Sequence, residues 1–192
     1  MRLQGMQNSN LTDNGLKQVK STANILKNQK FDTLYTSDLE RAVKTAEIIN
    51  TFHHLKINMD ASIRERNFGV MEGLTREQIQ EKYPEIHTGY MKRKEKYQIP
   101  EGENLVTFFN RVKKGVNQIV QLHEGEKILM IAHGGVLDCI MRMIFDYPLA
   151  SPRRFSIFNA SINRFSIENG EWFLEEWGNI SHHNTRILSL DA

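Results

Sequence analysis

The chain has 192 residues, of which 40% are hydrophobic and 25% are charged, so it is long enough for one α/β domain with a sizeable core. A formal net charge of +2, without a basic stripe, argues against a nucleic acid partner. No apolar run is long enough to cross a bilayer, no secretory signal opens the chain, and the single cysteine, Cys139, excludes an internal disulfide. We therefore expect a cytoplasmic protein with no membrane partner.

Two helices and a short strand are predicted in the first fifty residues. Met1–Gly5 is predicted to be a loop, with no strand before it. Thr12 or Asp13 can cap a first helix, Phe31–Thr36 has the composition of a short strand, and Ser37–Asp38 is expected to cap a second helix. The inward-facing residues expected on these helices are Leu16, Val19, Ala23, Leu26, Leu39, Ala42, Ala46 and Ile49.

The middle of the chain predicts a long loop followed by a polar segment. Ile63–Gly73 is charged and punctuated by glycine, which is typical of a functional loop. Thr75 and Gln78 have the spacing of a capping box, at the start of a helix that Pro84 is expected to end. Residues 85–103 are polar and rich in Lys, Arg and Glu, so we expect them to form a mobile cap.

A strand that leads into His133 is the clearest pattern in the sequence. Ile128–Ala132 is a run of five apolar residues, as expected for a buried parallel strand, and apolar residues return at helical spacing after Gly135. Asn104–His123 predicts an amphipathic helix, and residues 161–177 predict an antiparallel hairpin with an Asn-Gly turn. The inward residues expected on the helix are Phe108, Val112, Val116 and Ile119.

This order of elements predicts an α/β fold: a three-layer, doubly wound, mostly parallel sheet with helices on both faces. Ile57–Met59 is a further, weak strand candidate. The first, central parallel strand is expected to be missing from the front of the chain. The exposed edge of the hairpin would allow a homodimer.

Three residues that can handle a phosphate lie just beyond predicted strands: Arg41, Glu65 and His133. The carboxyl ends of neighbouring parallel strands converge, so these side chains can share one pocket. A guanidinium and a helix amino end suit the oxygens of an anion. A glutamate can protonate a leaving oxygen, and a histidine can stabilise the transferred charge.

Each of these residues also has a purely structural interpretation. Arg41 could pair at the surface with a glutamate of its own helix, and Glu65 could belong to a solvated charge cluster. A histidine such as His133 can simply be satisfied by hydrogen bonds at a strand end. His182 and His183 have no third ligand nearby, so no metal is expected there, and no cofactor is expected elsewhere.

Five short motifs follow one another along nearly the whole chain. They are Arg2–Gly5 with Leu11–Thr12 and Gly15, Thr36–Ala46 with the pattern S-x-L-x-R-A-x-x-T-A, Glu65–Gly69 with Glu72–Leu74, Pro100–Asn104, and Ala132–Gly135. In this order they resemble the motifs of the histidine phosphatase superfamily, in its phosphoglycerate mutase-like branch. The resemblance implies a single domain of that type over residues 1–192, with its variable cap at about 74–103.

The resemblance also implies a mechanism, which is phosphoryl transfer in two steps through a phosphohistidine. Arg41 would clamp the phosphoryl oxygens and His133 would stabilise their charge. Glu65 would give a proton to the leaving alcohol and later take one from water. The implied substrate-binding residues are Gln4, Gly5, Ser37 and Gly134. No metal is needed, because the work is mainly positioning and charge stabilisation.

The sequence departs from this family in one respect. The family's nucleophile lies in an Arg-His-Gly motif after its first strand, and no Arg-His-Gly occurs in these 192 residues. We therefore expect the motif and its strand to lie upstream of Met1, because of either a start codon placed too late or a true truncation. The chain as given is expected to be inactive. A descendant retained for binding is the other explanation.

The short spacing between Glu65 and His133 resembles the compact phosphatases of the family. The sequence therefore predicts a phosphomonoester hydrolase that acts on small phosphorylated metabolites. A cofactor-dependent phosphoglycerate mutase is the first alternative, because Lys92, Arg93 and Lys94 could mimic that enzyme's basic clamp. An inactive protein that binds an anion or a partner is the second.

Overall fold

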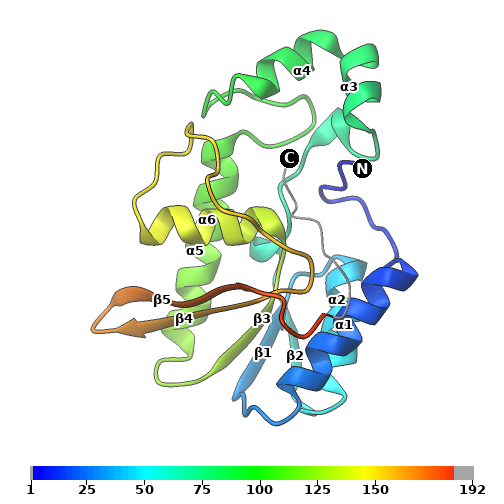
Figure 1. Ribbon diagram of the computed structural model, residues 1–192. Helices are drawn as coiled ribbons and strands as arrows, with labels where there is room; N and C mark the ends of the chain where they lie inside the picture. Colours follow the sequence, from blue (N-terminus) through cyan, green and yellow to red (C-terminus); the bar gives the residue numbers. More distant parts are fainter. Residues whose placement is uncertain (1, 184–192) are drawn as a thin grey trace.

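The structure is a computed structural model that describes residues 2–183, so Met1, the first residue of the predicted loop, lies outside this range. Its strands form two separate sheets (Figure 1). A parallel sheet has the order β2-β1-β3, and a two-stranded antiparallel sheet pairs β4 with β5. The strands are β1 (Thr33–Thr36), β2 (Ile57–Met59), β3 (Ile128–Ile131), β4 (Ile162–Glu168) and β5 (Glu171–Asn179).

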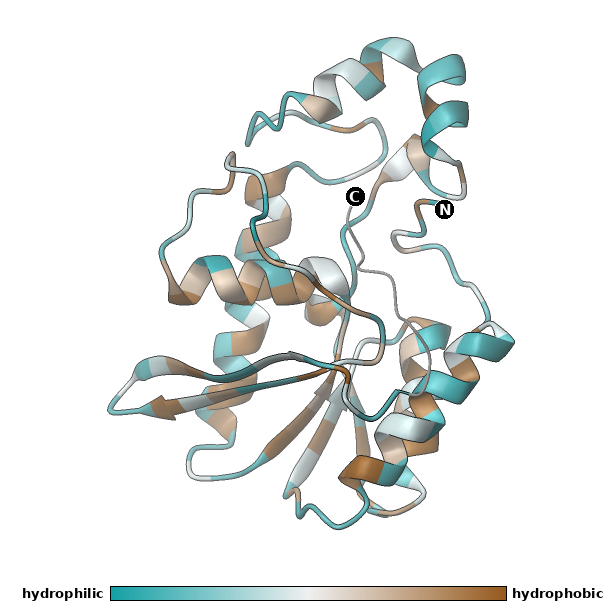
Figure 2. Ribbon diagram, viewed as in Figure 1, coloured by the Kyte–Doolittle hydropathy of each residue, from teal (hydrophilic) through white to brown (hydrophobic). Residues whose placement is uncertain are grey.

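Four of the six helices among residues 2–183 lie on the two faces of the parallel sheet, which confirms the predicted three-layer fold, and the two between residues 76 and 91 lie beyond the carboxyl ends of its strands (Figure 1). The helices are α1 (Asp13–Leu26), α2 (Glu40–Asn50), α3 (Arg76–Lys82), α4 (Pro84–Met91), α5 (Leu105–Leu122) and α6 (Gly134–Ile144), with short 3-10 turns at η1 (Ala61–Ile63) and η2 (Gly69–Met71). Figure 2 shows hydrophobic residues on the strands and on the helices beside them, whereas α3 is largely hydrophilic. None of the helices formed by residues 2–183 combines the length and apolar character that crossing a membrane requires.

The alternation of side chains along the strands explains the two layers of helices. Leu34 and Leu129 are partners in the β1–β3 register, and both are buried against α1 and α2. The next pair, Tyr35 and Met130, contacts the core formed by α5 and α6 on the opposite face. The predicted inward residues of α5 are all buried there, namely Phe108, Val112, Val116 and Ile119.

Three of the predicted helix starts are confirmed. Thr12 accepts a hydrogen bond from the backbone N–H of Gly15 at the start of α1. Thr75 and Gln78 form a complete capping box on α3. Asn104 caps α5 by accepting from the N–H of Thr107. In each case a short polar side chain satisfies an N–H group that the helix itself leaves unpaired.

One local prediction is wrong, and one helix was not predicted. Ser37–Asp38 does not cap α2, because its N-cap is Leu39, without a side-chain hydrogen bond, and the carboxylate of Asp38 instead pairs with Arg64. Pro84 ends α3 but also occupies the first turn of a further helix, α4. Proline is well suited to that position, since its missing N–H would have no partner in the first turn anyway.

Within residues 2–183, strand β3 has a strand partner along one of its two edges. It pairs with β1, and no strand among residues 2–183 pairs with its other edge. The β4–β5 hairpin contributes Phe165 and Trp172 to the core of α5 and α6, but it is not hydrogen-bonded to β3. Met130 and Ile131 on β3 remain only partly buried. The expectation of a missing neighbouring strand therefore stays a prediction.

Candidate active site

The carboxyl ends of β1 and β3 bring two polar residues together. Thr36 and Ile131, the last residues of these strands, are register partners. Ser37 and His133 follow them, and the Oγ atom of Ser37 lies 2.6 Å from Nε2 of His133. Both side chains are buried. Helices α2 and α6 begin just beyond these residues, so two helix amino ends border the same place.

Arg41, in the first turn of α2, extends toward the same place. Its Nη2 atom lies 3.3 Å from Nδ1 of His133. The guanidinium also donates to the carbonyl oxygens of Gly5, at 2.7 Å, and Gln7, at 3.0 Å. The neighbouring glutamates bond elsewhere, Glu47 to Lys44 and Glu40 to Asn8. The alternative of a surface pair on α2 is therefore wrong.

The two neighbours of His133 fix its tautomer. A guanidinium only donates hydrogen bonds, so Nδ1 of His133 accepts from Arg41. The ring proton therefore lies on Nε2, which donates to the hydroxyl oxygen of Ser37. Burial, together with the positive charges of Arg41 and Arg111, lowers the pKa of His133 to about 3. The imidazole is therefore neutral near pH 7, so it does not repel the positively charged guanidinium of Arg41 beside it.

Glu65 lies in the loop between η1 and η2, and it is tied to the start of α6. Its Oε2 accepts from the N–H of Gly135, at 3.0 Å, and its Oε1 accepts from the N–H of Arg66, at 2.7 Å. Desolvation of the carboxyl raises the pKa of Glu65, although the two N–H groups and the charges of Arg41 and Arg111 oppose the shift. A carboxyl held in this way is suited to donating a proton.

Gly135 is required by this arrangement. A Cβ atom at this position would lie 2.1 Å from Oε1 of Glu65, which is much closer than non-bonded atoms approach each other. The alternative that Glu65 belongs to a solvated charge cluster is therefore wrong. The three predicted residues Arg41, Glu65 and His133 surround one region at the carboxyl end of the sheet.

The predicted substrate-binding residues have different surroundings. Gly5 is buried, has a φ of +58°, and directs its carbonyl oxygen at Arg41. Gly134 is the first residue of α6, directly after His133. Gln4 is exposed, and its carbonyl accepts from the N–H of Gln7 in a turn, so no bond places Gln4 with His133. Ser37 is the hydrogen-bond partner of His133 described above.

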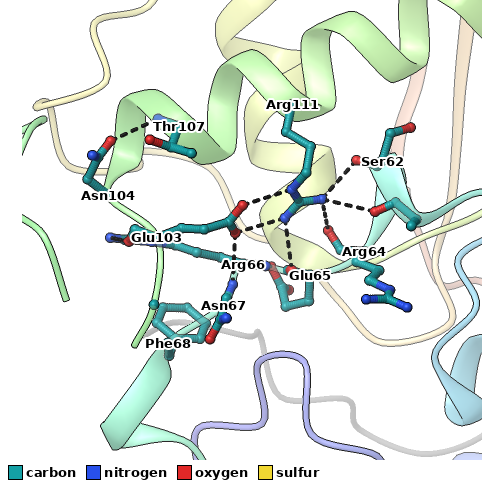
Figure 3. A network of polar contacts seen from close by, with 12 residues as sticks. Ser62, Arg64, Glu65, Arg66, Asn67, Phe68, Glu103, Asn104, Thr107 and Arg111 are labelled. Atoms are coloured by element: carbon teal, nitrogen blue, oxygen red, sulfur yellow. Dashed lines mark hydrogen bonds and ion pairs between the residues drawn. The ribbon is translucent and has the colours of Figure 1, made fainter. Parts of the chain in front are cut away.

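Two connections around this region were not foreseen from the sequence. Glu72 accepts from the N–H groups of Met6 and Phe68, each at 2.8 Å, and so ties the first residues of the chain to the loop of Glu65. Arg111 on α5 donates to backbone oxygens of the same loop and forms an ion pair with Glu103 (Figure 3). Glu72 and Glu103 lie within the motifs, but nothing local in the sequence indicates their partners.

Comparisons with known proteins agree with this geometry. The profile of the histidine phosphatase superfamily (branch 1) matches residues 1–180. Phosphoglycerate mutase-like protein 4 of Arabidopsis thaliana is 33% identical over 186 residues, which are 94% of this chain and 79% of that protein.

Solved structures give the same result. Bacillus stearothermophilus YhfR superposes with a TM-score of 0.86 and 30% identity, over 94% of this chain and 90% of that one. A mycobacterial glucosyl-3-phosphoglycerate phosphatase superposes with a TM-score of 0.78 and 25% identity, over 92% of this chain and 91% of that one.

Proposed function

Because the chain belongs to branch 1 of the histidine phosphatase superfamily, we propose that its site binds the phosphoryl group of a small phosphorylated metabolite and serves phosphomonoester hydrolysis. The observation that carries this proposal is the meeting of Arg41, Glu65 and His133 at the start of α6. A guanidinium, two helix amino ends and a carboxyl of raised pKa together suit an anion whose leaving oxygen must be protonated.

Each residue has a distinct role in the proposed reaction. A histidine nitrogen attacks phosphorus, the P–O bond to the alcohol breaks, and Glu65 gives its proton to the leaving oxygen. Water then attacks phosphorus, the P–N bond breaks, and Glu65 takes the proton of the water. Arg41 holds the phosphoryl oxygens in place of the carbonyls of Gly5 and Gln7, and His133 stabilises their charge. Ser37, Gly5 and Gly134 border the same oxygens, whereas support for Gln4 is limited to its place in the motif.

The attacking histidine is not among the residues of this site. No Arg-His-Gly occurs in the 192 residues, and both ring nitrogens of His133 are engaged, by Ser37 and by Arg41. We propose that a polypeptide of these residues alone does not turn over. The edge of β3 that lacks a partner among residues 2–183 is a suitable place for a strand that supplies the motif, because it would pair backbone groups there.

Two other functions have specific support. The Arabidopsis relative is named a phosphoglycerate mutase-like protein, which favours a mutase. An inactive protein that binds an anion or a partner is favoured by the engagement of both ring nitrogens of His133, with Ser37 and with Arg41. The name of the mycobacterial neighbour, a phosphatase, favours hydrolysis.

The single domain with its cap, the cytoplasmic location and the homodimer stay predictions.

The test is to extend the chain at its N-terminus with a short apolar strand that ends in Arg-His-Gly. Its control carries Arg-Asn-Gly, which keeps the strand but removes the nucleophile. We expect hydrolysis of p-nitrophenyl phosphate by the first protein only, and its loss in the first protein with Glu65→Gln. Without the extension, we expect neither turnover nor acid-labile phosphohistidine.

Two other outcomes decide against the hydrolase. Rapid conversion of 3-phosphoglycerate with its bisphosphate primer, together with negligible hydrolysis, would establish the mutase. A folded, extended protein that catalyses neither reaction but binds phosphate would establish the binding protein. Turnover by the unextended chain would refute the proposed need for an Arg-His-Gly.

A further inference from the structure

Arg111 is the centre of a polar network that connects α5 to the loop of Glu65 (Figure 3). The side chain lies on α5 and is 22% exposed. Its guanidinium donates to the carbonyl oxygens of Ser62, at 2.9 Å, of Arg64, at 3.2 Å, and of Glu65 itself, at 3.2 Å. A longer bond, of 3.3 Å, reaches the carbonyl oxygen of Ala61. One side chain therefore contacts most of the backbone that leads into Glu65.

Glu103 connects this guanidinium to the other side of the loop. Both of its carboxylate oxygens lie 2.8 Å from Arg111, one from Nε and one from Nη2. One of these oxygens also accepts from the N–H of Asn67, at 2.9 Å. The backbone oxygen of Glu103 accepts from the buried side chain of Arg66, at 2.7 Å. The Arg111–Glu103 ion pair thus holds the chain before and after Glu65.

The loop depends on side-chain bonds such as these because it has no regular secondary structure. Residues 64–68 belong to no helix or strand, so no ladder of backbone hydrogen bonds fixes them. Only arginine presents enough donors, in a rigid fork, to bind several carbonyls and a carboxylate at the same time. Lysine would keep the positive charge but lose this geometry, and carbonyls left unpaired inside a protein are costly.

We propose that Arg111 and Glu103 are positioning residues for Glu65, which hold its carboxyl against the N–H of Gly135 at the start of α6. The inference rests on the proposed role of Glu65 as proton donor. It extends that role by assigning the orientation of the carboxyl to the ion pair between Arg111 on α5 and Glu103 just before this helix, and neither residue contacts the substrate or the reacting atoms in the proposed reaction.

If Arg111 acts by positioning, it affects the pKa of Glu65 differently than if it acts by its charge alone. The positive charge of Arg111 by itself lowers the pKa of Glu65, whereas the burial that the loop imposes raises it. If Arg111 acted through its charge alone, Arg111→Lys would leave the pKa of Glu65 unchanged and Arg111→Met would raise it. If Arg111 holds the loop, both variants release Glu65 toward water, and the pKa falls toward that of an exposed glutamate.

The experiment titrates the side-chain carboxyl of Glu65 by NMR in the 192-residue chain, with ¹³C-labelled glutamate and Glu65→Gln for assignment. The N–H signals of Gly135 and Arg66 provide a second readout, because both groups donate to this carboxyl. We expect the pKa of Glu65 to fall in Arg111→Lys, in Arg111→Met and in Glu103→Gln. An unchanged pKa in Arg111→Lys, or a raised one in Arg111→Met, would overturn the proposal.

Arg142→Lys is the matched control. Arg142 is also buried, pairs with a carboxylate, Asp138, and donates to the carbonyl oxygens of Pro148 and Ser151. We expect this variant to leave the pKa of Glu65 unchanged. If the pKa of Glu65 fell as far in Arg142→Lys as in Arg111→Lys, the effect would come from a general loss of packing, and the proposal would be refuted.

These measurements need no turnover, so failure of the proposed hydrolysis would not alter their outcome. In the extended, active protein, Arg111→Lys should lower kcat more than it raises KM, and should shift the limb of the pH profile that Glu65 controls.

Discussion

The imidazole of His133 donates to the hydroxyl oxygen of Ser37 across 2.6 Å, although the two residues are 96 positions apart in the chain. This bond joins the carboxyl ends of β1 and β3 and leaves Nδ1 of His133 to accept from Arg41. It therefore sets the tautomer of the histidine and the place of the guanidinium together.

The depressed pKa of His133 predicts a loss of stability in mild acid. The pKa falls from 6.5 to about 3 on folding, so between these values the unfolded chain binds a proton that the folded chain does not. The free energy of unfolding should therefore decrease as the pH falls below 6.5. Between pH 7 and pH 5 this histidine should account for about 2 kcal/mol.

The measurement compares urea unfolding of the wild type and of His133→Gln at the two pH values. The wild type should lose more stability than the variant, because every other titrating group is common to both. Equal losses would mean that His133 is not buried in its neutral form.

The close packing of α5 on η1 predicts that Gly115→Ala destabilises the fold. A Cβ atom at Gly115 would lie 1.8 Å from Oγ and 2.4 Å from Cβ of Ser62. We expect a loss of about 1–3 kcal/mol, in spite of the better helix propensity of alanine. Ser62→Gly in the same chain should restore most of it, since it removes both overlapping atoms.

Gly15→Ala in α1 is the control for this pair. The nearest atom to its Cβ would be 3.4 Å away, so the variant should be neutral or more stable by up to about 1 kcal/mol. If Gly115→Ala behaved like Gly15→Ala in urea unfolding, α5 would not pack on η1 as described.

Gly135→Ala should damage the proposed chemistry more than the fold. The added Cβ would displace the carboxyl of Glu65, 2.1 Å away, from the N–H that it accepts. In the extended protein we expect kcat for hydrolysis to fall about 100-fold, which is in the range that a positioned acid contributes. Gly15→Ala, where the nearest atom lies 3.4 Å from the new Cβ, should keep the wild-type rate. A Gly135→Ala protein of normal activity would remove Glu65 from the reaction.

Hydrophobic periodicity predicted most of the fold. The apolar run before His133 predicts a buried strand, and the helical spacing of apolar residues in α5 predicts its buried face. Each pattern lies within a single segment of the sequence. Helix α4 was missed because its eight residues include a proline and a glycine, which are typical of loops, and none of the eight is buried. Position just beyond predicted strands suggested Arg41, Glu65 and His133 as a group, and the resemblance of the motifs was needed to choose them over their structural interpretations.

The partners of the charged residues could not be read from the sequence. Asp38 pairs with Arg64, 26 positions away, instead of capping α2. Arg41 bonds to carbonyls 34 and 36 positions earlier, not to the glutamates of its own helix. Arg111 resembles a solvated charge on an amphipathic helix, yet it contacts the loop before Glu65, 46 to 50 positions earlier. Such contacts depend on how distant segments meet, which local patterns do not encode.

The most direct test of the shared site is a titration of the ¹⁵N-labelled 192-residue chain with inorganic phosphate. We predict saturable chemical-shift changes at the amides of Gly5, Gly134 and Gly135 and at the side chains of Arg41 and His133. These changes should be lost in Arg41→Met. They should persist in the control Arg76→Met, which changes an exposed residue of α3. Shifts centred elsewhere, or an Arg41→Met chain that binds phosphate like the wild type, would contradict the existence of one phosphoryl site at the carboxyl end of this sheet.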